Sequence, residues 1–238
     1  MVDLELEQGL AVITIDRPEA RNAIAPETME QLEKALDEAE GAKALVIRGG
    51  GDRAFVSGGD LKELSKLRTV EQAAEMARQM RTVCDRIAAF PAPVVAALNG
   101  HALGGGAEVA VAADIRIAAD DIKIGFNQVS LAIMPAWGGA ERLSALVGRG
   151  RALMLAGSGT VLDASGAERL GLVDRVLPRS EFDEGWRSLA RALANDPAGE
   201  IKRVLAGASA EEAISAFAHL WVKDEHWAAA DKVLNRGK

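Results

Sequence analysis

Short apolar runs alternate with longer amphipathic segments through the first 140 residues of the chain. Apolar and β-branched residues fill 10–15, 43–48 and 93–98, and a proline or glycine follows each run within three positions. Runs of this length and composition, closed by such residues, predict buried strands. Two further runs, 114–118 and 122–125, suggest additional strands.

Helical spacing appears between these runs. Met29, Leu32 and Leu36 recur at intervals of three and four after Pro26, which predicts a helix from Pro26 to Glu40. A second helix is expected from Thr69, which forms a capping box with Gln72, to about Ala89. The apolar segment 107–113 suits a buried helix.

Strands that alternate with helices predict an α/β fold. From Glu141 onward the pattern is mainly helical, so a change near Ala140 separates a core from a helical tail. That tail carries apolar side chains at near-helical spacing, namely Phe217, Leu220, Trp221 and Trp227. A free terminal helix would not carry so many, and we expect them to pack on the body or on a neighbouring subunit.

The longest stretch without Asp, Glu, Lys or Arg runs over 87–107. It is long enough to suggest a membrane span, but two prolines, Asn99 and a run of glycines interrupt it. We interpret it as a strand, a turn and a helix start. The first ten residues show no basic and apolar pattern of a secretory signal, so we expect a cytoplasmic protein.

Composition narrows the choice of partners. The 238 residues are 49% hydrophobic and 26% charged, with 28 Lys+Arg against 35 Asp+Glu and a net charge of −7. An acidic chain without a basic stripe is a poor candidate for nucleic-acid binding. Its single cysteine, Cys84, excludes an internal disulfide and a cysteine-rich metal site.

Two glycine turns are the most informative features of the sequence. Each combines a strand end, a glycine turn and a helix start, over 54–64 and 99–108. Glycines allow close approach of a ligand to the backbone, and a helix start presents unpaired N–H groups. Two such ends facing each other would bind a developing oxyanion. Either turn could equally be only a turn, and neither fits a Walker or Rossmann phosphate loop.

Several motifs resemble the crotonase (enoyl-CoA hydratase/isomerase) superfamily. They are Ser57-Gly-Gly-Asp-Leu-Lys-Glu-Leu64 and Asn99-Gly-His-Ala-Leu-Gly-Gly-Gly-Ala-Glu108, together with an opening strand and turn over 11–23. Residues 135–143 and 170–176 look like later landmarks of that family. The motifs occur in the family's order and cover nearly the whole chain.

The resemblance implies a crotonase-like spiral of ββα turns with a helical C-terminal trimerisation region. It divides the chain into a core with the acyl-CoA site, 1–185, and a helical region, 186–238. We therefore expect a homotrimer or a dimer of trimers that acts on an acyl-CoA thioester. Coenzyme A is then part of the substrate, and neither a separate cofactor nor a metal is implied.

The resemblance also assigns site residues by position. The amides of Gly59 and Gly105 would form an oxyanion hole for the thioester oxygen. The backbone around Ser57, Gly59 and Leu61 would contact the adenine of coenzyme A, and Arg21 and Ala23 would lie near its phosphates and pantetheine. Asp60 and Trp137 would be further substrate-binding residues.

Glu108 matches the first of two glutamates that hydratases of the family use to activate water. Its neighbours Ala107 and Val109 are apolar, a setting that raises a carboxyl pKa and suits proton transfer. The alternative is a helix glutamate that pairs with a nearby arginine.

Gln128 occupies the position of the second glutamate, counted back from Pro135. An amide can orient a water or a carbonyl, but it cannot accept a proton. Two-glutamate hydration and the family's isomerase chemistry, which relies on this second position, are therefore both in question. Gln128 could also serve only in packing.

The other candidate site residues have weaker support from the sequence. Trp137 could line the acyl pocket or simply pack. Glu141 lies near a predicted helix start, where a carboxylate usually faces solvent. His101 lies beside the second glycine turn, and an isolated histidine there is a weak candidate for catalysis.

The sequence thus favours an acyl-CoA-processing enzyme of the enoyl-CoA hydratase/isomerase family, with Glu108 as acid/base. Two alternatives stay open. One is decarboxylation of a malonyl-CoA-type substrate, methylmalonyl- or ethylmalonyl-CoA, which needs only a single acid to protonate the enolate. The other is a non-catalytic acyl-CoA binder, because a fold alone does not establish activity.

Overall fold

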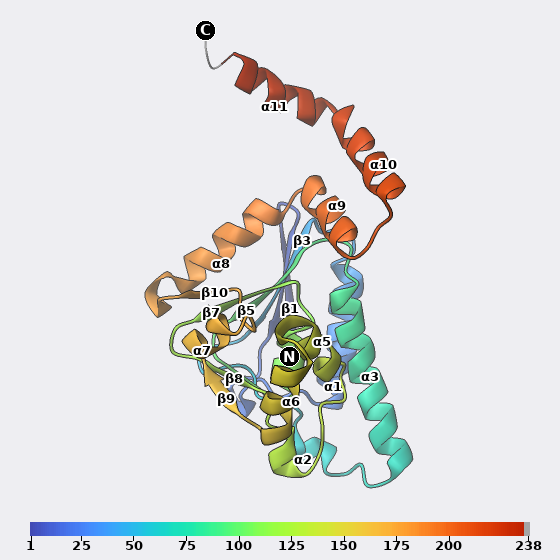
Figure 1. Cartoon of the computed structure of the whole chain (residues 1–238). Helices are drawn as coiled ribbons and strands as arrows, with labels where there is room; N and C mark the ends of the chain where they lie inside the picture. The colour runs from blue at the N-terminus through green and yellow to red at the C-terminus, as the bar shows by residue number, and fades with distance from the viewer. Residues whose placement is uncertain (236–238) are drawn as a thin grey trace.

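Two sheets form the centre of the molecule, which the computed structural model describes over residues 1–235 (Figure 1). In the larger sheet the strands lie in the order β1 (Val2–Glu7), β2 (Leu10–Ile15), β3 (Ala44–Gly49), β5 (Val94–Leu98), β7 (Ile115–Ala119) and β10 (Arg175–Leu177). The smaller sheet has the order β4 (Ala54–Val56), β6 (His101–Leu103), β8 (Lys123–Gly125) and β9 (Val161–Asp163). All neighbouring strands pair in parallel except β1 with β2 and β8 with β9.

The chain visits the two sheets in turn. Strands β3, β5 and β7 enter the larger sheet, and β4, β6 and β8, which follow them directly, enter the smaller one. A helix follows each pair before the chain returns. This is the predicted spiral of ββα turns within an α/β fold, and the prediction is confirmed.

The helices that follow these strands differ widely in length. They are α1 (Pro26–Glu38), α2 (Leu61–Leu64), α3 (Val70–Ala88), α4 (Gly105–Ala110), α5 (Gly139–Val147), α6 (Arg149–Ser158), α7 (Ala164–Arg169) and α8 (Arg179–Leu193). There are also two short 3-10 turns, η1 (Pro18–Ala20) before α1 and η2 (Gln128–Leu131) between α4 and α5. Helices α1 and α3 lie against each other, and α8 packs on the larger sheet.

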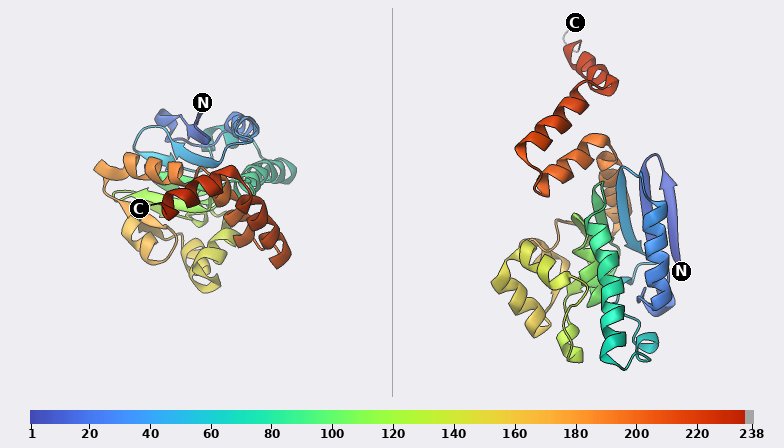
Figure 2. Two further views of the ribbon diagram at one scale, coloured as in Figure 1. Left: turned by 90° about the horizontal axis from the view of Figure 1, so that it is seen from above. Right: turned by 90° about the vertical axis from the view of Figure 1, so that its right-hand side faces the viewer.

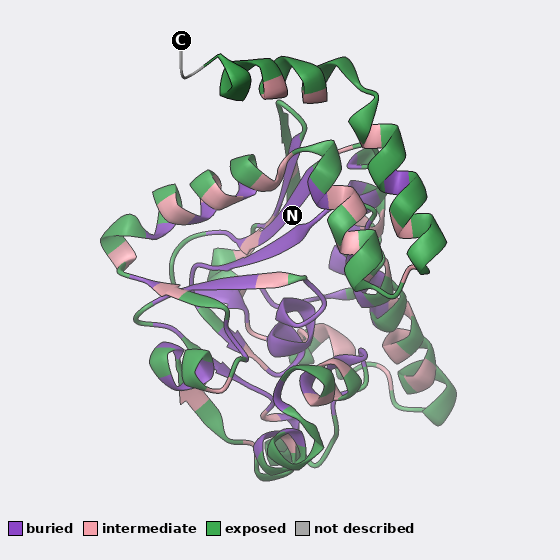
Figure 3. Ribbon diagram, turned by 45° about the horizontal axis from the view of Figure 1, so that its top comes forward, coloured by how far each residue is buried: buried purple, intermediate pink, exposed green. Residues whose placement is uncertain are grey.

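Most predicted elements occur where the pattern placed them. Every residue of β5 is buried, as its uninterrupted apolar run requires of a central strand in a parallel sheet. The capping box of α3 forms as expected, since the hydroxyl of Thr69 accepts from the amide of Gln72 and the Gln72 side chain accepts from the amide of Thr69. The core strands are almost wholly buried (Figure 3).

The helix predicted over 107–113 is shorter and earlier, because α4 begins at Gly105 and ends at Ala110. The chain must return to the larger sheet at once. The amide of Asp114 donates to the carbonyl of Val94, and the Asp114 carboxylate accepts from the Val94 amide at 2.7 Å. These two bonds bring residue 114 beside β5 and end the helical segment before it.

The hairpin of β1 and β2 was not predicted. Its turn consists of Gln8 and Gly9, both with positive φ, which is the geometry that two-residue hairpin turns require. In β1, Val2 and Leu4 are partly buried while Asp3 and Glu5 face solvent. Charged positions on an edge strand discourage pairing with another chain, and they also obscure the strand in the sequence.

Helix α9 (Asp196–Leu205) lies against the end of the larger sheet, where Lys202 donates to the carbonyl of Ala92 at 3.1 Å and pairs with Asp114 at 2.7 Å. Helices α10 (Ala210–Trp221) and α11 (Asp224–Leu234) extend away from it (Figures 1 and 2).

Of the apolar tail side chains, Phe217 is 62% exposed, Trp221 45% and Trp227 47%. The rings of Phe217 and Trp227 each contact the ring of Trp221, with centroids 5.4 and 5.5 Å apart. Leu220 is half-buried and lines a cavity between α10 and the body. Of the two alternatives predicted for the aromatic side chains, packing on the body or on a neighbouring subunit, the second therefore stays a prediction.

The subunit contact and the trimer stay predictions, as does the division at residue 185, through which α8 runs. The last three residues of the predicted helical region lie outside the described residues. Within residues 1–235, the helices are all too short or too polar to cross a membrane.

Candidate active site

The residues that the two glycine motifs contribute meet at one small cavity. It has a volume of about 200 Å³ and lies between the β4–α2 turn, the β6–α4 turn, α3 and the segment that leads from η2 into α5. Among the residues that line it are the predicted Ser57, Gly59, Leu61, Gly105, Glu108, Gln128 and Trp137. Apolar side chains complete the wall, from Leu64, Met76, Leu131, Ile133 and Met134.

Both glycine turns depend on backbone that other residues adopt with difficulty. Gly58 has φ +107° and Gly104 has φ +55°. A Cβ on Gly58 would lie 3.4 Å from the amide nitrogen of Gly105, so the two turns are direct neighbours. A Cβ on Gly106 would overlap the carbonyl of Val56, which explains how α4 can begin so close to β4.

The amides of Gly59 and Gly105 are both unused by the protein. Within residues 1–235 neither N–H donates a hydrogen bond, although the neighbouring Asp60 amide donates to the carbonyl of Ile24 at 2.8 Å. Both glycines line the same cavity. Two free donors at one cavity are suited to bind an oxygen that gains negative charge.

Glu108 lies in the wall of this cavity and is only 2% exposed. Its Oε2 accepts from the amides of Trp137 at 2.8 Å and Gly139 at 2.9 Å, and its Oε1 accepts from Nε2 of Gln128 at 2.9 Å. Its partners are therefore backbone amides and an amide side chain, and no arginine within residues 1–235 forms a salt bridge with it.

The surroundings of Glu108 shift its pKa upward. Burial disfavours the charged carboxylate and raises the pKa of Glu108, although the three N–H donors partly oppose the shift. A raised carboxyl pKa suits a group that accepts and returns a proton near neutral pH.

Gln128 opens the η2 turn and is 7% exposed. Its Nε2 is used by Glu108, while its Oε1 is buried without a hydrogen-bond partner in the part of the chain that the structure describes. A buried acceptor without a donor is costly, and it indicates a place for a bound group that donates.

Trp137 is 6% exposed and forms the side of the cavity next to the glycines. A Cβ on Gly59 would lie 3.9 Å from Cζ2 of the indole, and a Cβ on Gly105 would overlap the ring. The sequence left packing and pocket lining open for Trp137. The structure places it in both positions, since the ring is buried and also lines the cavity.

Three of the predicted binding residues lie outside the cavity lining. Arg21 is exposed, and its carbonyl accepts from the amide of Ser57 at 3.2 Å. Ala23 is buried. The Asp60 carboxylate caps α2 and pairs with Arg17 at 2.9 Å. All three therefore flank the first glycine turn from the outside.

Two buried asparagines that the sequence analysis missed hold the segments around the first glycine turn. Nδ2 of Asn22 donates to the carbonyls of Gly50 and Ala54, at 2.9 and 2.7 Å. Oδ1 of Asn99 accepts from the amide of Gly49 at 2.9 Å. The only available signal was an asparagine within each motif.

The weaker candidates lie elsewhere. His101 and Glu141 do not line the cavity, and both are exposed. Nδ1 of His101 accepts from the amide of Lys123, and Glu141 pairs with Arg81 at 2.8 Å.

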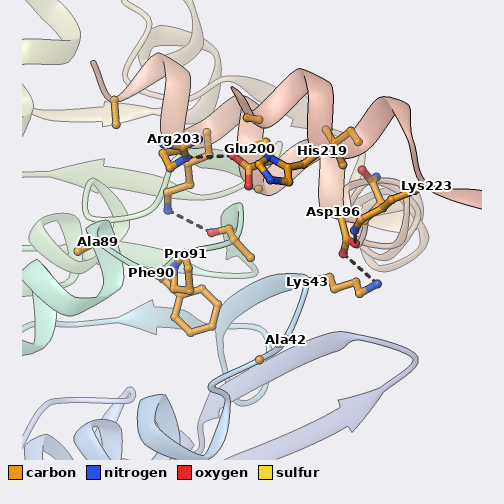
Figure 4. A pocket seen from close by; sticks show the side chains of 18 of the residues that line it. Ala42, Lys43, Ala89, Phe90, Pro91, Asp196, Glu200, Arg203, His219 and Lys223 are labelled. Carbon is orange, nitrogen blue, oxygen red and sulfur yellow. Dashed lines mark hydrogen bonds and ion pairs between the residues drawn. The ribbon is translucent and has the colours of Figure 1, made fainter. Parts of the chain in front are cut away.

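A larger cavity, about 700 Å³, lies between helices α9 and α10 and the loops that precede β3 and β5 (Figure 4). Its charged groups pair with one another. Asp196 contacts Lys43 at 3.0 Å and Lys223 at 2.7 Å, and Arg203 contacts Glu200 at 2.9 Å. None of the predicted site residues lines it, so the smaller cavity is the better candidate for chemistry despite its size.

Comparisons with known proteins agree with this geometry. The enoyl-CoA hydratase/isomerase family model matches residues 5–216. The chain is 36% identical to a short-chain-enoyl-CoA hydratase of Clostridium acetobutylicum, over 84% of this chain and 78% of that protein. It is 41% identical to a probable enoyl-CoA hydratase of Bacillus subtilis, over 81% and 76% of the two chains.

Solved structures show the same likeness in three dimensions. An enoyl-CoA hydratase from Thermoplasma volcanium superposes with a TM-score of 0.86 at 32% identity, covering 97% of this chain and 96% of that one. The chain therefore belongs to the enoyl-CoA hydratase/isomerase family, the crotonase superfamily.

Proposed function

We propose that the protein hydrates a 2-enoyl-CoA thioester, with Gly59 and Gly105 as oxyanion donors and Glu108 as the group that transfers the proton. One observation carries the proposal. Two backbone amides without partners and a buried carboxyl group of raised pKa line the same cavity. The names of the relatives support the same reaction class.

The two amides would act on the thioester oxygen. Water that adds to Cβ pushes the electron pair of the double bond toward the carbonyl, and negative charge develops on that oxygen. Donors fixed in place stabilise this charge more than they stabilise the neutral ester, and one donor contributes about 10²–10³ in rate.

Coenzyme A would bind along the first glycine turn, which also forms part of the cavity lining. The segment 21–24 runs beside the turn, because the amide of Ile24 donates to the carbonyl of Gly58 at 2.8 Å. Backbone of Ser57 and Leu61 would face the adenine, and the exposed Arg21 would lie near the phosphates. Asp60 would then act on the shape of the turn, through its cap on α2 and its pair with Arg17.

Gln128 is the observation that favours a second candidate, decarboxylation of methylmalonyl- or ethylmalonyl-CoA. Loss of CO₂ needs the oxyanion donors and one acid, and it does not need the second carboxylate that Gln128 replaces. Against this stands the cavity lining, which contains no Lys, Arg or His among the described residues. A substrate carboxylate would have no positive partner there, and for that reason we place hydration first.

A panel of thioesters tests the proposal. The purified protein is assayed for hydration of crotonyl-CoA and for decarboxylation of methylmalonyl- and ethylmalonyl-CoA. We expect hydration, reduced about 10²–10⁴-fold by Glu108→Gln. Glu141→Gln is the matched control, because it makes the same chemical change at an exposed residue outside the cavity.

The other outcomes each contradict hydration in a different way. Decarboxylation without hydration would identify the second candidate. Tight binding of the thioesters without turnover would identify a non-catalytic binder. Failure to bind any of these thioesters would exclude hydration, decarboxylation and non-catalytic binding alike.

A further inference from the structure

The direction of the Gly59 N–H is set from the opposite side of its own peptide unit. A trans peptide unit is planar, so the carbonyl of Gly58 points away from the N–H of Gly59. That carbonyl accepts from the amide of Ile24 at 2.8 Å. The bond therefore points the Gly59 N–H away from Ile24, and it also polarises the peptide unit that carries this N–H.

A second peptide unit extends the arrangement by one step. The Ile24 amide belongs to the unit whose carbonyl is that of Ala23, and this carbonyl accepts from Nη1 of Arg17 at 2.6 Å. A chain of hydrogen bonds thus begins at the Arg17 guanidinium, passes through the peptide units 23–24 and 58–59, and ends at the free N–H of Gly59. Hydrogen bonds in series strengthen one another, and a charged donor at the start adds to the effect.

The guanidinium at the start of this chain is itself held in place. Nη2 of Arg17 donates to Oδ2 of Asp60 at 2.9 Å, and the amide of Asp60 donates to the carbonyl of Ile24 at 2.8 Å. The Arg17 side chain is 22% exposed and that of Asp60 13%. One planar fork therefore fixes both the segment before α1 and the residue directly after Gly59.

The other donor, Gly105, is arranged without an arginine. Its peptide unit contains the carbonyl of Gly104, which accepts from the amides of Ala107 and Glu108 at 3.1 and 3.3 Å. These amides belong to the first turn of α4. The Gly105 donor thus depends on its own helix, whereas the Gly59 donor depends on a cationic side chain from a distant part of the sequence.

We propose that Arg17 is a positioning residue of the oxyanion hole, which orients and strengthens the Gly59 donor through the peptide units 23–24 and 58–59. This inference rests on the proposed function, in which the Gly59 N–H binds the thioester oxygen. Arg17 does not line the cavity, so it acts through the backbone and not on the substrate directly. Its contribution grows as negative charge develops on the thioester oxygen, and it therefore favours the transition state over the bound ester.

Three arginine variants separate this role from a purely structural one. Arg17→Met removes the charge and both hydrogen bonds. Arg17→Lys keeps the charge, but an ammonium group does not reproduce the planar fork. Arg86→Met is the matched control, because Arg86 also joins a backbone carbonyl and a carboxylate, those of Glu33 and Asp37, and does not line the cavity. Circular dichroism establishes that each variant folds.

Infrared spectroscopy of a bound thioester measures the strength of the donors. Butyryl-CoA has no double bond to hydrate, so it binds without turnover, and carbon-13 at its thioester carbonyl identifies the carbonyl stretch. Hydrogen bonds to the carbonyl oxygen lower this frequency. With saturating protein, the wild type and Arg86→Met should lower it equally, Arg17→Met should lower it less, and Arg17→Lys should lie between them.

The rate should follow the same order. For Arg17→Met we expect kcat for crotonyl-CoA hydration to fall about 10²-fold, as for a donor displaced by about 1 Å. Arg17→Lys should lose less, and Arg86→Met should keep the wild-type kcat. If Arg17→Met does not fold, Arg17→Lys alone decides the comparison with the wild type.

A carbonyl frequency in Arg17→Met equal to that of the wild type would overturn the inference even where kcat falls, because the loss would then come from structure elsewhere. A wild-type kcat in this variant would overturn it as well. A wild-type protein that binds butyryl-CoA without any shift of the carbonyl stretch would instead overturn the oxyanion hole itself, and with it the proposed function.

Discussion

The indole ring of Trp137 lies so close to Gly105 that no side chain fits between them. A Cβ on Gly105 would overlap the ring, and the Gly105 amide is one of the two free donors at the cavity. The absence of a side chain at residue 105 is therefore a condition for both the position of the ring and the position of the donor.

Gly105→Ala should lower the rate of hydration strongly while leaving the fold in place. The added methyl group must displace either the indole or the first turn of α4, and a donor moved by about 1 Å loses about 10²-fold in rate. Hydration of crotonyl-CoA measures the loss. Gly150→Ala on α6 is the control, because nothing lies within 4 Å of its Cβ.

The double variant Gly105→Ala with Trp137→Gly tests the cause. Removal of the ring makes room for the methyl group, so this variant should be more active than Gly105→Ala alone. A Gly105→Ala protein with the wild-type rate would show that the donor at residue 105 is not needed.

The pH dependence of activity should report Glu108. Burial raises its pKa, and as the proton acceptor it must be ionised, so kcat/KM should fall as the pH decreases through a value above that of an ordinary carboxyl group. A pH profile of kcat/KM measures this limb. Glu141→Gln should leave this acidic fall of kcat/KM unchanged. A fall at the pH of an ordinary carboxyl group would exclude Glu108 as the base.

The same shift has a consequence for stability, with a defined sign. A group whose pKa is raised by folding contributes stability that is fully present below its unfolded pKa and is lost as the pH rises through the folded pKa. The wild type should therefore lose stability as the pH rises from acidic to neutral, and Glu108→Gln should not show this loss. The difference in free energy of unfolding between the two proteins should shift in favour of the variant as the pH rises. Urea unfolding at both pH values measures the difference.

Arg116 should be a major contributor to stability away from the cavity. It is 1% exposed, and its guanidinium donates to the carbonyls of Ala113 and Leu172 at 2.9 Å and to Asp174 at 2.7 Å. These bonds join β7 to the segment that leads into β10. Loss of one partner of a buried ion pair costs about 3–5 kcal/mol.

We expect Arg116→Met to lower the free energy of urea unfolding by an amount at the lower end of that range, because Asp174 can reach solvent. Arg78→Met is the matched control, since Arg78 pairs with Glu75 at the surface and such pairs contribute about 0–1 kcal/mol. Equal effects of the two substitutions would contradict the role of Arg116.

How much of this structure the sequence predicts depends on the range of the contacts involved. Local signals sufficed for β5, whose five residues are all buried, and for the capping box of Thr69. Motif order predicted that residues 59, 105, 108 and 128 share one site. Local periodicity says nothing about which backbone amides reach a given carboxylate, so the contacts of Glu108 with residues 137 and 139 could not be foreseen.

The exposed tail gives the last prediction. Helices α10 and α11 carry Phe217, Trp221 and Trp227, which are all about half exposed or more. Exposed aromatic side chains of this size leave apolar surface in contact with water. We expect another copy of the chain to cover them, in a trimer or a dimer of trimers. Light scattering coupled to gel filtration measures the mass of the assembly.

Substitution of the two tryptophans separates assembly from folding. Trp221→Glu with Trp227→Glu should yield smaller assemblies while far-UV circular dichroism stays unchanged, because both rings are about half exposed on their own chain. Leu153→Glu on α6, which is 66% exposed, is the control for a charge placed at another exposed apolar position. A wild-type monomer would contradict the subunit contact, and so would an assembly that tolerates both tryptophan substitutions.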